Sequence, residues 1–155
     1  MTTYTQVRAA LKSSIFAITE AGGYNRTQTL AKFCTNWNSA KQNKDQPSVY
    51  PKVFLSTGDI QSRNEVGRRK EVTATYFLTI IVLESADNRN HGVTTPAEDQ
   101  IEAIVEDVEK RLAADYTLGG LVVSTEITSI SVDAGFANPE GIAIFELSAK
   151  WHKQY

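Results

Sequence analysis

Two histidines and one cysteine are the side chains of this sequence best suited to nucleophilic or metal chemistry. His91 lies in a turn-rich segment and His152 near the end of the last predicted strand, and neither has a neighbour at metal-ligand spacing. Cys34 stands among apolar neighbours without a recognisable base, which favours a packing role, and a lone cysteine cannot form an internal disulfide. We therefore expect two surface histidines, no catalytic residue, no metal, no cofactor and no enzymatic activity.

Carboxylates line one face of a segment with helical periodicity. They are Asp99, Glu102, Glu106, Asp107 and Glu109. Hydrolysis by paired carboxylates needs one acid with a raised pKa inside a pocket, whereas a solvated helix face explains these residues without a special site. A second interpretation makes Asp99, Glu102, Glu106 and Glu109 a channel-facing surface that repels DNA phosphates.

A basic segment, residues 60–70, carries Arg63, Arg68, Arg69 and Lys70 and is expected to form an extended hairpin loop. It has two readings: an exposed tip kept soluble by charge, or a contact for DNA phosphates or an acidic partner. Glu65 and Glu71 dilute the positive charge, and no aromatic side chains are interleaved for base stacking. These features favour the first reading.

Two amphipathic helices must position these groups. The first is predicted from about Thr5 to Glu20, with Val7, Leu11, Ile15 and Ile18 on one stripe and Gly22-Gly23 as its stop. The second begins with a capping box, Thr95 with Glu98 around Pro96, and should end near Asp115. Its apolar stripe is formed by Ile101, Ile104, Val105, Val108 and Leu112. The pair Gly119-Gly120 matches no phosphate-binding pattern and indicates a turn.

Four strands are predicted around these helices. The first, 49–56, contains Pro51 and should lie at an edge, with Thr57-Gly58-Asp59 breaking it. The others are 71–84, which is predicted as a central strand, 122–132, with a bulge between Ile127 and Ile130, and 142–151. The last strand alternates, with Phe145, Leu147, Ala149 and Trp151 on one face. Residues 24–48 read as a variable loop or insertion. The order α-β-β-α-β-β predicts an α+β domain over 1–155: an antiparallel sheet of about four strands with two helices packed on one face.

The composition narrows the class of protein. Of the 155 residues, 41% are hydrophobic and 22% charged, which is typical of a globular chain. The net charge of -2 argues against a dedicated nucleic-acid binder. Because we find neither a signal-peptide pattern nor an apolar run long enough for a bilayer, we expect a soluble, cytoplasmically made protein without a membrane partner.

The order of elements resembles a known family. The pieces that carry the likeness are the first helix, the entry Tyr50-Pro51-Lys52-Val53-Phe54, the long strand after the basic loop, the run 112–120 ending in Leu-Gly-Gly, and the final hairpin ending at Trp151. Together they are similar to the tail-terminator, or tail-completion, proteins of tailed bacteriophages. The likeness covers most of the chain, and 24–48 fits least well.

This resemblance implies a structural virion protein. Such proteins form a ring, typically a hexamer, that caps the tail tube, ends its polymerisation and provides the attachment surface for the head or neck. The implied partners are further copies of the chain, the tail tube protein and a neck or head–tail connector protein, with DNA only passing through the channel. The implied location is the virion tail or neck, after assembly in the host cytoplasm.

Three alternatives remain open from the sequence. One is another part of the same machine, either a neck or head-completion protein or a tube subunit. Another is a small-ligand or enzymatic domain on a ferredoxin-like sheet, which would need a pocket with convergent polar groups. The third is a nucleic-acid module that binds through the basic loop.

Overall fold

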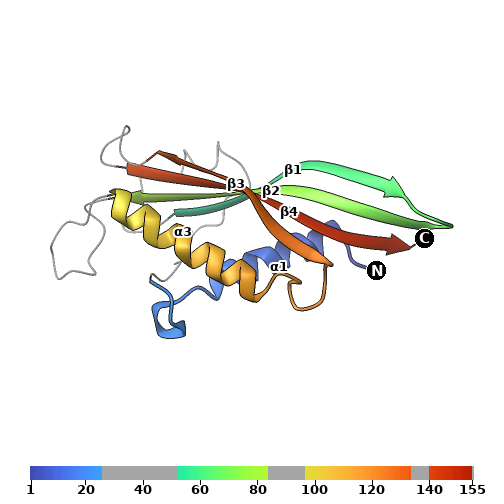
Figure 1. The fold of residues 1–155 in the computed structure, drawn as a ribbon, viewed down its shortest axis with the longest axis horizontal. Helices are drawn as coiled ribbons and strands as arrows, with labels where there is room; N and C mark the ends of the chain where they lie inside the picture. Colours follow the sequence, from blue (N-terminus) through green and yellow to red (C-terminus); the bar gives the residue numbers. More distant parts are fainter. Residues whose placement is uncertain (26–51, 84–96, 134–139, 155) are drawn as a thin grey trace.

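The computed structural model describes residues 1–25, 52–83, 97–133 and 140–154 (Figure 1). Within these residues the chain forms a four-stranded antiparallel sheet in the order β1-β2-β4-β3. The strands are β1 (Lys52–Asn64), β2 (Arg69–Leu83), β3 (Ser124–Asp133) and β4 (Glu140–Gln154). β1 and β3 are therefore the sheet edges, and the two longest strands, β2 and β4, pair at its centre.

Among the described residues, two α-helices lie on one face of this sheet (Figure 1). They are α1 (Tyr4–Phe16) and α3 (Ala97–Ala114), and a short 3-10 turn, η1, spans Glu20–Gly22. For the described residues, the predicted α+β architecture with helices packed on one face of an antiparallel sheet is confirmed. The predicted cap residues Thr95 and Pro96, and nearly all of the predicted insertion 24–48, lie outside the described residues.

Helix α1 begins with a capping box that the sequence reading missed. The Thr3 hydroxyl accepts from the Gln6 amide at 3.2 Å, and the Gln6 side chain accepts from the Thr3 amide at 2.9 Å. The predicted extension to Glu20 is wrong: the α-helix ends at Phe16, and η1 follows. Ile18 is still fully buried, so its apolar side chain joins the core from outside the helix.

The predicted break at Thr57-Gly58-Asp59 is also wrong. β1 continues to Asn64, and the pairing with β2 only shifts register between Thr57 and Ile60. Gly58 fits this bulge because a Cβ there would lie 2.6 Å from the Phe77 ring of the neighbouring strand. Gly58 therefore does not break the strand, and its missing side chain leaves room for the Phe77 ring on the paired strand.

The last two strands agree more closely with expectation. β3 and β4 pair with a register shift between Ile127 and Ser129, where the slipped alternation predicted a bulge. Four alternate residues of β4, Phe145, Leu147, Ala149 and Trp151, are buried as predicted. They adjoin the even-numbered residues of β2, with Phe145 opposite Leu78 and Leu147 opposite Tyr76. This face, together with the apolar stripes of α1 and α3, makes the main core.

Polar contacts join the ends of the two helices. The Arg111 Nε donates to the Ser14 carbonyl at 3.0 Å, and the Ser14 hydroxyl donates to Asp115 at 2.9 Å. Asp115 also accepts from the amide of Gly119, in a turn where Leu118, Gly119 and Gly120 all have positive φ. The turn that leads into β3 is thereby tied to both helices.

Candidate interaction surfaces

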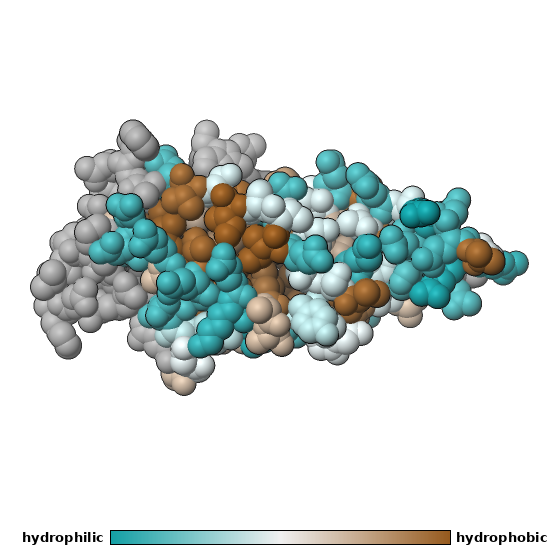
Figure 2. Space-filling view, viewed as in Figure 1, coloured by the Kyte–Doolittle hydropathy of each residue, from teal (hydrophilic) through white to brown (hydrophobic). Residues whose placement is uncertain are grey.

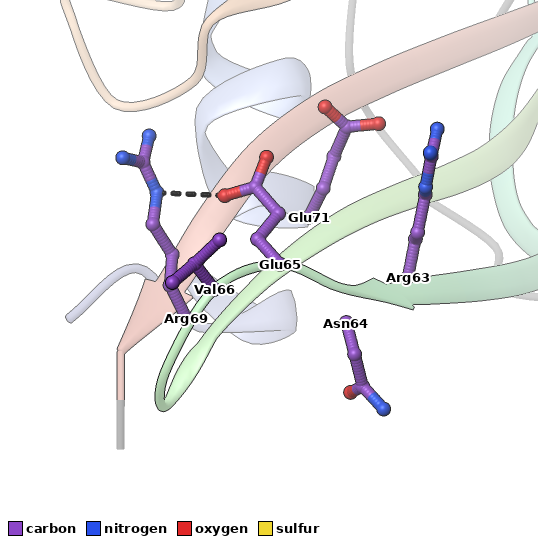
Figure 3. Close-up of a pocket in the computed structure, with 6 residues that line it drawn as sticks. All are labelled: Arg63, Asn64, Glu65, Val66, Arg69 and Glu71. Carbon is purple, nitrogen blue, oxygen red and sulfur yellow. Dashed lines mark ion pairs between the residues drawn. The ribbon is translucent and has the colours of Figure 1, made fainter.

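The β1–β2 hairpin extends past the helices to form one end of the molecule (Figure 1). Its turn is closed by a backbone hydrogen bond, in which the Glu65 amide donates to the Arg69 carbonyl at 3.0 Å. The side chains of the same two residues form an ion pair, with Arg69 Nε 2.9 Å from a Glu65 carboxylate oxygen (Figure 3). Gly67 takes a left-handed φ of 78°, as a tight turn requires. Val66 at the tip is 97% exposed, so it contributes little to the core of its own chain.

The four basic residues predicted for a loop are placed differently from that prediction. Arg63 belongs to β1, Arg69 and Lys70 belong to β2, and only Arg68 lies in the turn. The prediction of a long loop over 60–70 is therefore wrong, because ladder pairing continues to Asn64 and Lys70. Exposure of Arg63, Arg68 and Arg69 is confirmed, but Arg69 is already paired with Glu65.

His152 is not the isolated surface histidine that the sequence suggested. It lies opposite Glu71 in the β2–β4 ladder, and its Nδ1 is 3.4 Å from a Glu65 carboxylate oxygen. Glu65, Glu71 and His152 each offer a ligand atom, all within 4.8 Å of one another. Sequence spacing could not reveal this group, because its members come from a turn and two strands.

The three side chains could in principle hold a divalent cation, since carboxylate oxygen and imidazole nitrogen both bind such ions. Two cations of the protein already occupy the carboxylates, however. Arg69 pairs with Glu65 at 2.9 Å, and the Lys150 Nζ lies 3.6 Å from Glu71. An incoming metal would have to displace both ion pairs, so the group acts in this structure as a charge-balanced cluster at the hairpin base.

Most of the acidic residues on α3 face outward as predicted. Of the five carboxylates assigned to this face, the exposed ones are Asp99, Glu102, Glu106 and Glu109. Asp107 departs from the prediction: it is 1% exposed and accepts from the Asn25 amide at 2.7 Å. A buried carboxylate needs such a donor, and Asp107 therefore anchors the chain after η1 to α3 instead of joining the acidic face.

A groove lies between α3 and the edge strand β3, with a volume of about 530 Å³. Its lining combines apolar side chains with three carboxylates of α3. The residues are Glu98, Ile101, Glu102, Val105, Glu106, Ile130 and Val132. Figure 2 shows hydrophobic surface gathered on this side of the molecule, with hydrophilic surface beside it. Val132 is 51% exposed, although it lies opposite the buried Ala143 in the β3–β4 ladder.

The sequence reading predicted the carboxylates of this groove but not its floor. Ile101 and Val105 were assigned to the helix stripe, and Ile130 and Val132 to a strand. Ile101 is buried, but Val105, Ile130 and Val132 are at least partly exposed, because β3 has a strand on one side only among the described residues. Slipped alternation in β3 was the only available signal that its apolar residues are incompletely covered.

Two residues considered for chemistry in the sequence analysis have no described position. Cys34 and His91 lie outside the described residues. In the part of the chain that the structure describes, no helix is long and apolar enough to cross a membrane. Comparison with protein-family models and with curated proteins found no match for this chain.

Proposed function

We propose that this chain is a structural subunit of a tailed-phage particle, which assembles as a ring that caps the tail tube and receives the head or neck. The observation that carries the proposal is a pair of unlike surfaces on one subunit. One is the hairpin tip with Arg63 and Arg68, and the other is the α3–β3 groove with Glu102 and Glu106.

Such a pair fits a cyclic assembly. A ring uses heterologous contacts, in which one patch of each subunit meets a different patch of the next. The architecture supports the same proposal, because two helices on one face of a four-stranded antiparallel sheet match the element order that resembles tail-terminator proteins. In this proposal the work is done by surface complementarity between subunits and tube.

The proposed partners follow from the position of such a ring. They are further copies of the chain, which form a ring that is typically hexameric in the family that the chain resembles, together with the proteins above and below that ring. Its lower face contacts the tail tube protein, its upper face a neck or connector protein, and DNA passes through its centre.

The test is to delete the gene from the genome of the phage or particle that carries it, and to measure tail length by negative-stain microscopy. Overlong tubes without heads are expected, and a plasmid copy of the gene should restore normal length. Tails of normal length without heads would assign a neck or head-completion role instead, and missing tubes would assign a tube role. Intact infectious particles would overturn the structural proposal.

A further inference from the structure

The hairpin tip exposes one apolar side chain between basic side chains. Val66 is 97% exposed at the turn, and Arg63 and Arg68 beside it are also exposed. The turn is held by a backbone hydrogen bond and an ion pair between Glu65 and Arg69. The tip is therefore an ordered protrusion, and ordering it on binding costs little further entropy.

The groove has the complementary character. Its floor is apolar, formed by Ile101, Val105, Ile130 and Val132, and its rim carries carboxylates of α3 that include Glu102 and Glu106. A valine side chain would cover apolar floor, while arginines beside it would meet the carboxylates. Opposite charges placed this way favour the correct register and speed encounter.

The two surfaces cannot meet within one chain. The hairpin tip and the part of α3 and β3 that forms the groove lie toward opposite ends of the longest axis of the molecule (Figure 1). Figure 2 shows the hydrophobic surface near one end and mainly hydrophilic surface toward the other. Contact between them therefore requires two copies arranged head to tail.

We propose that the hairpin tip of one copy docks in the α3–β3 groove of the next copy, with Val66 on the apolar floor and Arg63 and Arg68 facing Glu102 and Glu106. This inference rests on the proposed ring and names its subunit contact. It also assigns Glu102 and Glu106 to a neighbouring subunit instead of to a DNA channel. Head-to-tail contacts of this kind close into a ring when the rotation between subunits permits.

Cysteine cross-linking tests the contact directly. In a Cys34→Ser background, Val66→Cys is combined with Val132→Cys in the groove, or with Val123→Cys as the matched control. Val132 and Val123 are 51% and 50% exposed, but Val132 lies near the end of β3, whereas Val123 precedes the first residue of that strand. Mild oxidation should give a ladder of disulfide-linked oligomers only with Val132→Cys. Equal ladders from both pairs, or none from either, would overturn the inference.

Reversing the charges on the two surfaces tests the same contact without any cysteine substitution. Glu102→Lys with Glu106→Lys, and separately Arg63→Glu with Arg68→Glu, should each reduce the assembled mass measured by light scattering to that of the monomer. An equimolar mixture should reassemble, because each altered groove then accepts an altered tip and each native groove a native tip. Failure of the mixture to regain mass would contradict the contact.

The outcomes separate this inference from the proposed function. Rings without the Val66–Val132 cross-link would remove the contact and leave the ring proposal standing. A specific cross-link together with normal tails after gene deletion would keep the contact and remove the tail-capping function.

Discussion

The helix-covered middle of the sheet and the hairpin tip share strand β2, yet they have different roles. In the middle, Tyr76, Leu78 and Phe145 are at most 1% exposed beneath α1 and α3. At the tip, Val66 and three arginines face solvent. Burial beneath the helices stabilises the fold, whereas the tip is free to vary without unfolding the chain. The difference teaches that stability and association can be tested separately in this protein.

The largest expected effect comes from truncating the middle. Phe145→Ala should lower the free energy of unfolding by about 3 to 5 kcal/mol, because it removes a fully buried ring and leaves a cavity. Val66→Ala is the control and should change it by less than about 0.5 kcal/mol, as for other exposed positions. Urea denaturation measures both. Similar losses in the two variants would erase the contrast between middle and tip.

A second effect depends on pH. Burial raises the pKa of Tyr76 from 10.0 to about 12, an effect that nearby Arg8 partly offsets. The folded state holds this proton more tightly than the unfolded state, so the stabilisation is complete below pH 10 and is lost as pH rises toward 12. Two pKa units correspond to about 2 to 3 kcal/mol.

The variant Tyr76→Phe isolates this contribution. The hydroxyl has no hydrogen-bond partner among the described residues, so its removal should cost little stability at pH 7. Denaturation at pH 9 and pH 11 should show a smaller loss for Tyr76→Phe than for the native chain. An identical loss would mean that Tyr76 is not the group that titrates.

Two glycine substitutions compare the packing of the middle of the sheet with the backbone of the hairpin tip. A Cβ at Gly141 would lie 2.7 Å from Ile101 and 3.0 Å from Ala97, so Gly141→Ala should push α3 from β4 and cost about 1 to 3 kcal/mol. Gly67 at the tip has open space but a positive φ, so Gly67→Ala should cost about 1 to 2 kcal/mol through backbone strain alone. Thermal unfolding compares them. A larger loss at Gly67 would show that the turn contributes more than the helix–sheet contact.

The smallest effect concerns the ion pair at the tip. Arg69→Ala should lower stability by about 0.2 to 1 kcal/mol, since an exposed pair gains little in water. High salt should reduce the difference between this variant and the native chain. Arg68→Ala serves as the control, with no expected change in stability. A loss above about 2 kcal/mol for Arg69→Ala would indicate that the tip is part of the folding unit.

The buried faces of β2, β4 and α3 could be predicted from the sequence, whereas the course of β1 could not, and the reason is physical. The alternation in β2 and β4 and the stripe of α3 predicted their buried faces, because burial repeats with the period of each element. The β1 prediction failed at Gly58, since a glycine can break a strand or admit a neighbouring ring. The local pattern does not distinguish these cases, and only the position of Phe77 on the adjacent strand decides.

The candidate surfaces show the same division. The sequence by itself determined the two helices, the four strands, the bulge in β3, the exposed arginines and most of the acidic face. Tertiary structure alone decided that Asp107 is buried, that His152 joins Glu65 and Glu71, and that Ile130 and Val132 line a groove with α3. Periodicity reports which face of an element is apolar. Which elements meet, and where a sheet edge is left uncovered, depends on contacts between residues far apart in the chain.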